Sequence, residues 1–302
     1  MQYISKKNIK LPIRKKQSKK GDNGKALIIG GSKDYAGAVA LAGLAALRSG
    51  CDWVTIAAPE KVAWIINTLS LDLVTIKLKG DYFSLKHLKE ILKLSKKHNV
   101  VLIGNGIGIK KETKQLIKKI IEVKNQKVID ADGIKSIKLQ DINDSILTPH
   151  NKELEILLKN SKIANKEIKS IINEKNIQKK ALLIKKAIKN LNNKNKSNNK
   201  IKNNFFEKNN VILLKGKIDI IISKNRIYYN KTGNPGMTKA GTGDVLAGLC
   251  AGFLAQGLSL EQSAINTAYF NGLIGDILLK KKKGFTYLAS DMVEEIGRIL
   301  QY

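Results

Sequence analysis

Residues 234–248 read NPGMTKAGTGDVLAG, a glycine-rich loop that runs directly into an apolar segment with helical spacing. The spacing predicts a helix that begins near Asp244 and continues through Leu249, Phe253 and Leu254. Glycines allow backbone N–H groups to approach a phosphate, and the first turn of a helix adds unpaired N–H donors and a partial positive charge. This stretch therefore predicts an anion site at the start of a helix.

Asp244 is the only carboxylate in this stretch. A carboxylate at the mouth of a phosphate site repels phosphate unless it accepts a proton from a nucleophile or holds a metal ion. We therefore predict that Asp244 is a general base. The structural alternative is an N-cap or a partner of the helix dipole, in which case the Gly-Thr-Gly turn simply joins two elements.

Strand patterns and helical patterns alternate along the rest of the chain. Strands are expected at 25–29, 53–57, 100–103, 127–130, 145–148 and 211–214, and a hairpin at 218–223 and 226–230. Helices are expected at 39–49, 61–69, 111–122, 260–279 and 289–300. This alternation is typical of a mostly parallel sheet with helices on both faces, which binds ligands beyond the carboxyl ends of its strands.

Polar residues collect immediately after several of these strands. Asp130, Asp132, His150 and Asn151 are expected on one rim of the sheet. His150 follows a strand end and a proline, where a rigid loop can direct a side chain into a crevice, so we predict a substrate contact for it. As structural alternatives, a lone histidine is more often structural, and the aspartates could cap a helix.

The composition restricts the classes of protein to consider. With 302 residues, 43% of them apolar, the chain can bury a substantial core. Its net charge of +30 suggests nucleic-acid binding, but the lysines are spread along the whole chain and aromatic residues make up only 5%. We therefore favour solvated basic faces, which would also attract an anionic nucleotide.

The sequence shows no targeting or membrane segment. No window approaches about 18 uninterrupted apolar residues, and the N-terminus lacks the apolar core of a signal peptide, so we predict a cytoplasmic protein. Cys51 and Cys250 have neither metal-ligand spacing nor a disulfide pattern and are expected to be buried. His87 and His98 lie in lysine-rich helical surroundings and are expected at the surface.

The chain is expected to contain a basic leader at 1–23 and a single domain at 24–302. Within the domain, a segment at about 190–208 is rich in Lys and Asn, and its centre has too few apolar residues to fold against other elements. We predict an exposed low-complexity insertion there.

Several separated segments agree with one protein family. They are GGS at 30–32, YAGA at 35–38, AALRSG at 45–50, IGNGIG at 103–108, DAD at 130–132, LTPH at 147–150, LKG at 214–216, NPGM at 234–237 and GTGD at 241–244. On these segments the sequence resembles the ADP/ATP-dependent NAD(P)H-hydrate dehydratases of nicotinamide nucleotide repair. The resemblance implies a ribokinase-like α/β fold, a three-layer α/β/α sandwich with a mostly parallel central sheet.

The resemblance also implies a repair reaction on NADHX or NADPHX, in which the reduced nicotinamide ring has added water. ADP or ATP would phosphorylate the ring hydroxyl, phosphate would leave, and the ring double bond would be restored. Asp244 would take the hydroxyl proton. Magnesium is expected with the phosphates, and no metal-ligating residue is assigned.

The resemblance assigns the remaining site residues. Substrate contacts are expected from Ala38, Gly106, His150 and Asp244. Nucleotide contacts are expected from Lys215, Gly216, Lys217, Ile218, Asp219 and Gly243. The backbone N–H groups of Gly241, Thr242 and Gly243 would form the anion hole.

Two positions depart from the family's usual pattern. The family usually has proline where this chain has Asn105, and many members have threonine where it has Asp219. Many relatives are also fused to an epimerase domain that interconverts the hydrate epimers, and the stretch before Gly24 is too short for one. A separate epimerase is therefore a candidate partner, and a homo-oligomer is a further candidate because relatives often form oligomers.

Two other functions stay open. A small-molecule kinase of the same fold, acting on a vitamin precursor or a sugar, would use the same base and anion hole but would stop at the phosphorylated product. A basic nucleic-acid-binding protein would lose affinity steeply with salt and would be indifferent to Asp244. Product analysis separates the first alternative from the dehydratase, and salt dependence separates the second.

Overall fold

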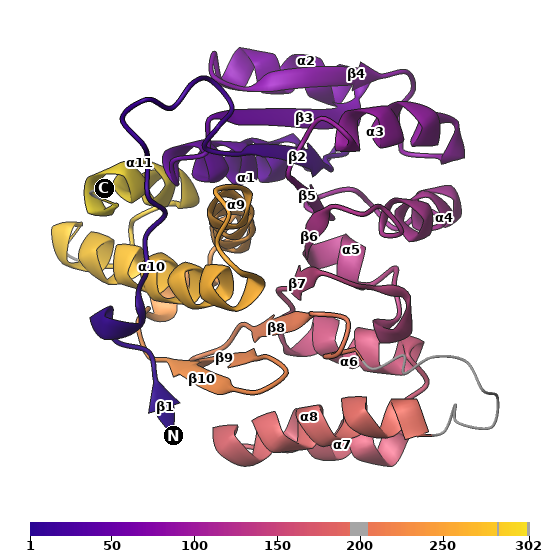
Figure 1. The fold of residues 1–302 in the computed structure, drawn as a ribbon, viewed down its shortest axis with the longest axis vertical. Coiled ribbons are helices and arrows are strands. Elements are labelled where there is room, and N and C mark those ends of the chain that lie inside the picture. The colour runs from indigo at the N-terminus through magenta and orange to yellow at the C-terminus, as the bar shows by residue number, and fades with distance from the viewer. Residues whose placement is uncertain (194–204, 283, 301–302) are drawn as a thin grey trace.

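The computed structural model describes residues 1–193, 205–282 and 284–300. Within these residues, ten strands form one sheet, in the order β1-β10-β9-β8-β7-β6-β5-β2-β3-β4 (Figure 1). The strands are β1 Gln2–Tyr3, β2 Lys25–Ile29, β3 Trp53–Pro59, β4 Val74–Leu78, β5 Val100–Ile103, β6 Gln126–Ile129, β7 Ser145–Leu147, β8 Val211–Leu214, β9 Asp219–Ile222 and β10 Ile227–Asn230. Among the described strands, β9 alone runs antiparallel to its neighbours. The predicted mostly parallel sheet is confirmed.

The central strands are buried on both faces, which explains their continuous apolar sequences. β2 and β5 pair in parallel with Leu27 opposite Val101, and both side chains are fully buried. The next pair along, Ile28 and Leu102, points to the other face and is buried as well. A strand covered on both faces must be apolar at every position, so alternation of polar and apolar residues is absent from β2 and β5.

Two layers of helices cover the sheet (Figure 1). One layer contains α1 Ala36–Arg48, α2 Glu60–Leu69, α9 Thr242–Ala255, α10 Leu260–Lys281 and α11 Ala289–Ile299. The other contains α3 Leu88–Ser95, α4 Lys111–Ile120, α5 Ala131–Ile134, α6 Asn151–Asn160, α7 Asn165–Asn173 and α8 Ile177–Asn193. Short 3₁₀ turns lie at Lys6–Asn8, Leu85–His87, Leu139–Asp141 and Pro235–Thr238. The predicted three-layer α/β/α sandwich is confirmed.

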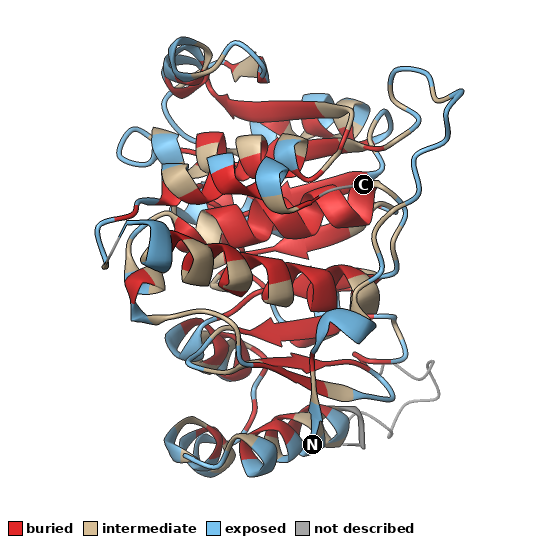
Figure 2. Cartoon of the chain, turned by 90° about the vertical axis from the view of Figure 1, so that its left-hand side faces the viewer, coloured by how far each residue is buried: buried red, intermediate tan, exposed pale blue. Residues whose placement is uncertain are grey.

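Burial follows these layers (Figure 2). The strands and the inner faces of the helices are buried, and α9 is buried along nearly its whole length because it lies between other helices and the sheet. Cys51 and Cys250 are buried, as predicted. Within the described part of the chain, no helix is both long and apolar enough to cross a membrane.

Several elements lie where the sequence predicted none. They are β4 and the consecutive helices α6, α7 and α8. In α8 the apolar side chains of Ala181, Ile184 and Ile188 recur at helical spacing and are buried. The many Lys and Asn residues around these positions made the apolar periodicity difficult to recognise in the sequence. His87 is also buried rather than exposed, because its Nδ1 accepts the Ser84 N–H at 3.2 Å and its ring packs in the core.

The segment expected as a basic leader packs against the domain. β1 adds a strand to the sheet beside β10, and the Ile4 N–H donates to the Tyr229 carbonyl oxygen at 2.8 Å. Further along, the Asn266 side chain donates to the Lys10 carbonyl oxygen at 2.7 Å. This segment therefore covers the sheet edge and part of α10.

Only the ends of the insertion predicted at about 190–208 are described, because residues 194–204 lie outside the described residues. On one side the segment continues α8 to its end at Asn193. On the other side, Phe205 and Phe206 are buried, with ring centroids 4.9 Å apart. These two rings anchor the chain to the core before β8 begins.

Small residues allow α9 to lie very close to α1. A Cβ atom added to Gly248 would lie 2.1 Å from the Ala42 carbonyl oxygen, and one added to Gly252 would lie 1.9 Å from Ser49 Oγ. Neither separation is sterically possible, so the crossing requires glycine at both positions. This close packing fixes where the N-terminus of α9 lies relative to the sheet.

We predict that Gly248→Ala destabilises the protein by about 1–3 kcal/mol, because the new methyl group must push α9 away from α1. Gly297→Ala in α11 is the matched control, since its Cβ would come no closer than 3.7 Å to the Arg48 side chain. Replacing an exposed helical glycine with alanine should instead stabilise by about 0.5–1 kcal/mol. Thermal unfolding of both variants measures the difference, and equal midpoints would contradict the packing argument.

Candidate active site

The candidate site lies where the chain changes direction across the sheet. β2 leads through α1 to β3 on one side, whereas β5, the other neighbour of β2, leads to β6 on the opposite side. Parallel sheets bind ligands beyond the carboxyl ends of their strands at such a switch point. The loops after β2, β5, β6, β7 and β8 all reach this edge.

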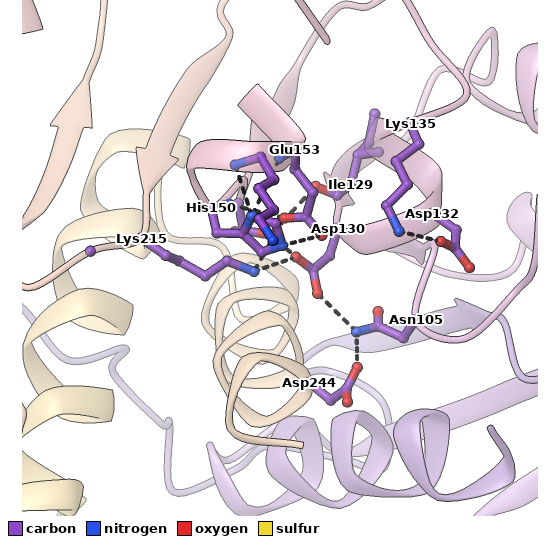
Figure 3. Close-up of polar contacts among 12 residues, drawn as sticks. Asn105, Ile129, Asp130, Asp132, Lys135, His150, Glu153, Lys215 and Asp244 are labelled. Atoms are coloured by element: carbon purple, nitrogen blue, oxygen red, sulfur yellow. Dashed lines mark hydrogen bonds and ion pairs between the residues drawn. The ribbon is translucent and has the colours of Figure 1, made fainter. Parts of the chain in front are cut away.

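Asp130, which follows β6, is the centre of a hydrogen-bond network at this edge (Figure 3). Its Oδ1 accepts from Thr148 Oγ1 at 2.7 Å and from Lys215 Nζ at 2.9 Å. Its Oδ2 accepts from Asn105 Nδ2 at 3.1 Å. The Asp130 side chain is only 3% exposed, so these donors replace water. One carboxylate therefore joins the loops after β5, β6, β7 and β8.

Lys215 brings a positive charge to the first turn of α9. Burial by itself would lower the pKa of Lys215, but the Asp130 and Glu153 carboxylates outweigh burial and raise that pKa. The second of these carboxylates lies 3.8 Å from Nζ. A Cβ atom added to Gly243 would lie 3.6 Å from the same nitrogen. The ammonium group is thus charged and beside the helix N-terminus, where it can neutralise phosphate.

The N-terminus of α9 presents backbone donors. The helix begins at Thr242, and Gly241 precedes it in the left-handed conformation with a φ of 92°. The N–H groups of Gly243 and Asp244 make no hydrogen bond with the described residues, and the Thr242 N–H reaches the Lys239 carbonyl oxygen only at 3.4 Å. These first-turn groups can therefore donate to an anion.

Asp244 lies beside these donors in an environment that favours its protonated form. Its Oδ1 accepts from Asn105 Nδ2 at 2.6 Å. Burial raises the pKa of Asp244 from its ordinary value of 3.8 to about 7, with Asn105 and Lys215 opposing the rise and Asp130 and Glu153 adding to it. A carboxylate that titrates near neutrality can accept and release a proton at working pH, as a general base requires.

The other residues expected to contact substrate lie on both sides of the network. Ala38 is in the first turn of α1, and a Cβ atom added to Gly106 would lie 3.4 Å from the Ala38 Cβ. His150 caps α6, because its Nδ1 accepts the N–H groups of Lys152 and Glu153 at 3.1 and 3.3 Å. The proton of the neutral imidazole then lies on Nε2. This nitrogen lies 3.4 Å from Glu153 Oε1, and the His150 side chain is 49% exposed.

The segment after β8, expected to contact the nucleotide, is ordered by Asp219. Its Oδ1 accepts the Gly216 N–H at 3.1 Å, and its Oδ2 accepts from Asn230 Nδ2 at 3.1 Å. Burial raises the pKa of Asp219 to about 6. Lys217 is exposed and Ile218 is partly buried. The carboxylate thus holds a backbone donor that a phosphate would otherwise compete for.

Sequence reasoning missed Asn105 and Glu153 as members of the site. Asn105 lies 139 residues from Asp244, so its bond to that carboxylate follows only from the order of the strands. Glu153 did carry a sequence signal, because it stands three residues after His150 and accepts the His150 N–H at 2.9 Å, as in a capping box. The cap turns the Glu153 carboxylate toward Lys215.

The described residues include no group of three or more His, Cys, Asp or Glu side chains placed to hold a metal ion. Lys215 already lies between the carboxylates of Asp130 and Glu153. The side chains therefore fit a magnesium ion carried mainly by phosphate oxygens and water, which is the usual mode for nucleotide-bound Mg²⁺.

Comparison with known proteins identifies the family. Residues 26–298 match the Carb_kinase family model, which describes NAD(P)H-hydrate dehydratases. The chain belongs to this family. It is 37% identical to the bifunctional NAD(P)H-hydrate repair enzyme Nnr of Methanothermobacter thermautotrophicus, over 97% of this chain and 52% of that protein. It is 30% identical to the ADP-dependent (S)-NAD(P)H-hydrate dehydratase of Cenarchaeum symbiosum, over 96% of this chain and 93% of that protein.

The chain thus spans about half the length of the bifunctional curated relatives it matches. Solved structures share its fold. A ribokinase-like superfamily protein from Enterococcus faecalis matches with a TM-score of 0.77 and 22% identity, over 98% of this chain and 94% of that one. The ADP/ATP-dependent NAD(P)H-hydrate dehydratase from Bacillus subtilis, co-crystallised with ATP/Mg²⁺, matches with a TM-score of 0.72 and 24% identity, over 96% and 95%. The predicted ribokinase-like fold is confirmed.

We predict that Asp130→Asn destabilises the protein by about 3–5 kcal/mol, because it leaves the Lys215 ammonium without its closest counter-charge. Asp132→Asn, two residues along the chain, is the matched control. Asp132 pairs with Lys135 at 2.8 Å, but the two side chains are 18% and 34% exposed, so losing this pair should cost about 1 kcal/mol or less. Denaturant unfolding at neutral pH measures both costs, and equal losses would contradict the central role of Asp130.

Proposed function

We propose that this protein is a nucleotide-dependent dehydratase that converts NADHX or NADPHX back to NADH or NADPH. The observation that carries the proposal is the position of Asp244, beside the Lys215 ammonium and the free N–H groups of α9, in a chain of the NAD(P)H-hydrate dehydratase family. A base that titrates near neutrality beside a phosphate-binding helix terminus suits phosphoryl transfer to a hydroxyl.

The chemistry follows from these neighbours. Asp244 accepts the proton of the ring hydroxyl as the hydroxyl oxygen attacks the terminal phosphorus of ADP or ATP, and the bond from that phosphorus to the nucleotide breaks. Lys215 and the N–H groups of Gly241, Thr242 and Gly243 stabilise the negative charge that moves during transfer. The ring carbon–oxygen bond then breaks and phosphate leaves with the former hydroxyl oxygen. An adjacent ring carbon loses a proton, and the ring double bond returns.

The hydrated nicotinamide substrate and the nucleotide contact different loops. Ala38, Gly106 and His150 contact the hydrated nicotinamide ring or its attached groups, in line with their places after β2, β5 and β7. The segment 215–219 and Gly243 hold the nucleotide. The names of two relatives support this assignment of donors, because one is an ADP-dependent dehydratase and another was crystallised with ATP/Mg²⁺. A magnesium ion bound to the phosphates would reduce their charge.

An NAD(P)H-hydrate epimerase is the partner that we infer for this activity. The bifunctional relatives carry the repair function in a chain about twice as long as the matched part. An epimerase would convert the unreactive hydrate epimer to the one that the dehydratase accepts. A cytoplasmic location and self-association remain predictions from the sequence.

The decisive experiment supplies hydrated NADH or NADPH to the purified protein with magnesium and either ADP or ATP. We expect the near-ultraviolet absorbance of the reduced nicotinamide ring to return only when nucleotide is present, and the active nucleotide identifies the donor. Nucleotide consumption without recovery of this absorbance would instead indicate a kinase that stops at the phosphorylated product. No response to either nucleotide would overturn both enzyme assignments.

Replacing Asp244 with asparagine should lower turnover by about a hundredfold or more, because asparagine cannot accept the hydroxyl proton. Asp72→Asn is the control, since Asp72 is exposed on the turn between α2 and β4, away from the site. Steady-state rates for both variants with the same donor measure the effect. An Asp244→Asn protein with full turnover would remove Asp244 from the role of base.

A further inference from the structure

Asn105 occupies a loop whose shape does not depend on its side chain. The flanking residues Gly104 and Gly106 have φ angles of 127° and 62°, which favour glycine. A Cβ atom added to Gly104 would lie 1.9 Å from the Asp130 carbonyl oxygen. The Asn105 carbonyl oxygen accepts the Gly31 N–H at 2.8 Å. Glycines and backbone contacts therefore set this loop, and the Asn105 side chain is available for another role.

The Asn105 side chain is fully buried, and its amide nitrogen is committed to two carboxylates. Nδ2 donates to Asp244 Oδ1 at 2.6 Å and to Asp130 Oδ2 at 3.1 Å (Figure 3). Its Oδ1 has no hydrogen-bond partner among the described residues. The reversed amide would point Oδ1 at two carboxylate oxygens, which repel it. The two carboxylates thus fix the orientation of Asn105.

Asn105 is the direct donor to a carboxylate surrounded by mixed charges. Asp130 after β6 and Glu153 on α6 both disfavour a negative charge on Asp244, whereas Lys215 after β8 favours it. Lys215, however, directs its hydrogen bond to Asp130. Helix α1, which packs along α9, carries no titratable side chain before Arg48 at its far end. Within the described residues, Asn105 therefore supplies the hydrogen bond that the Asp244 carboxylate receives.

We propose that Asn105 is a positioning residue for the base Asp244, which it holds next to Asp130 through one shared amide nitrogen and stabilises as the carboxylate. The inference rests on the proposed function for the role of Asp244 and adds a residue that orients and tunes it. The family resemblance implies proline at this position, and proline has no side-chain donor. The hydrogen bond to the Asp244 carboxylate therefore depends on the asparagine in this chain.

The test is the pH dependence of turnover in Asn105→Ala. Burial and neighbouring charges raise the pKa of Asp244 to about 7 in the intact site, and loss of the Asn105 donor should raise it further. The acidic limb of kcat/KM against pH should move up by about one pH unit, with most of the loss in kcat rather than in KM for the nucleotide. Asn67→Ala is the control, because it removes an amide oxygen that accepts from Thr75 and Lys77 on β4. This variant should leave the acidic limb unchanged.

Asn105→Asp tests the same point without changing side-chain volume. It removes the donor and adds a carboxylate between Asp130 and Asp244, so the limb should move at least as far as in Asn105→Ala. A limb that stays at the wild-type pH in both variants, with turnover lowered equally at every pH, would overturn the proposal and leave Asn105 a space-filling role.

The pH dependence of unfolding provides a readout that needs no catalysis. The pKa of Asp244 is higher in the folded state than in the unfolded state. Its contribution to folding stability is therefore fully present below the unfolded-state pKa and is lost as the pH rises through the folded-state pKa. If Asn105→Ala raises that pKa, its destabilisation relative to wild type should grow between pH values of about 5 and 9. A constant difference would contradict the proposal. If the wild-type protein failed to restore the reduced ring, the proposed function would fall while this comparison still decided the link between Asn105 and Asp244.

Discussion

The hydrogen bonds and the ion pair at the Asp130 carboxylate hold the functional edge of this protein together. A charge that is almost completely removed from water is tolerable only when donors replace the lost hydration, and Thr148, Lys215 and Asn105 supply them. Each donor comes from the end of a different strand. The parallel direction of β5, β6, β7 and β8 is what brings them within reach of one another, so the sheet topology and the buried charge depend on each other.

The second constraint is the close approach of α9 to α1. Gly248 and Gly252 allow the two backbones to touch, and this places the first turn of α9 at the carboxyl edge of the sheet. Asp244 is then buried among other carboxylates, with a lysine and an amide as its compensating neighbours. Burial makes ionisation of Asp244 costly, while Asn105 and Lys215 keep the cost moderate. Burial and the neighbouring donors thus act in opposite directions on the pKa of Asp244, and together they produce a base that can exchange a proton near neutral pH. The Gly-Thr-Gly-Asp sequence alone does not determine this property.

Much of this arrangement could be predicted from the sequence, because the features concerned are local. The continuous apolar strands, the glycine loop before α9 and the polar residues after strand ends each carry their own signal. The helices α6 to α8 were missed because their apolar stripes are diluted by Lys and Asn residues. The packing of the N-terminal segment was missed because a two-residue strand such as β1 has no periodicity to detect.

The network itself could not be predicted, since its contacts join residues that are far apart in sequence. Asn105 appears in the sequence as a departure from a family pattern, and only the neighbouring positions of β5 and α9 give it a partner. His150 illustrates the opposite case. Its place after Thr148 and Pro149 was evident from the sequence, yet the structure adds a capping role through Nδ1 and a contact of 3.4 Å between Nε2 and the Glu153 carboxylate.

The site keeps Asp244 able to exchange a proton near neutral pH. Carbon-13 NMR titration of the side-chain carboxyl groups in the ligand-free protein tests it directly, with Asp244→Asn to assign the signal. We expect the signal missing from Asp244→Asn to titrate with a midpoint of about 7 in the wild-type protein. A midpoint of about 4, as in an exposed aspartate, would contradict it.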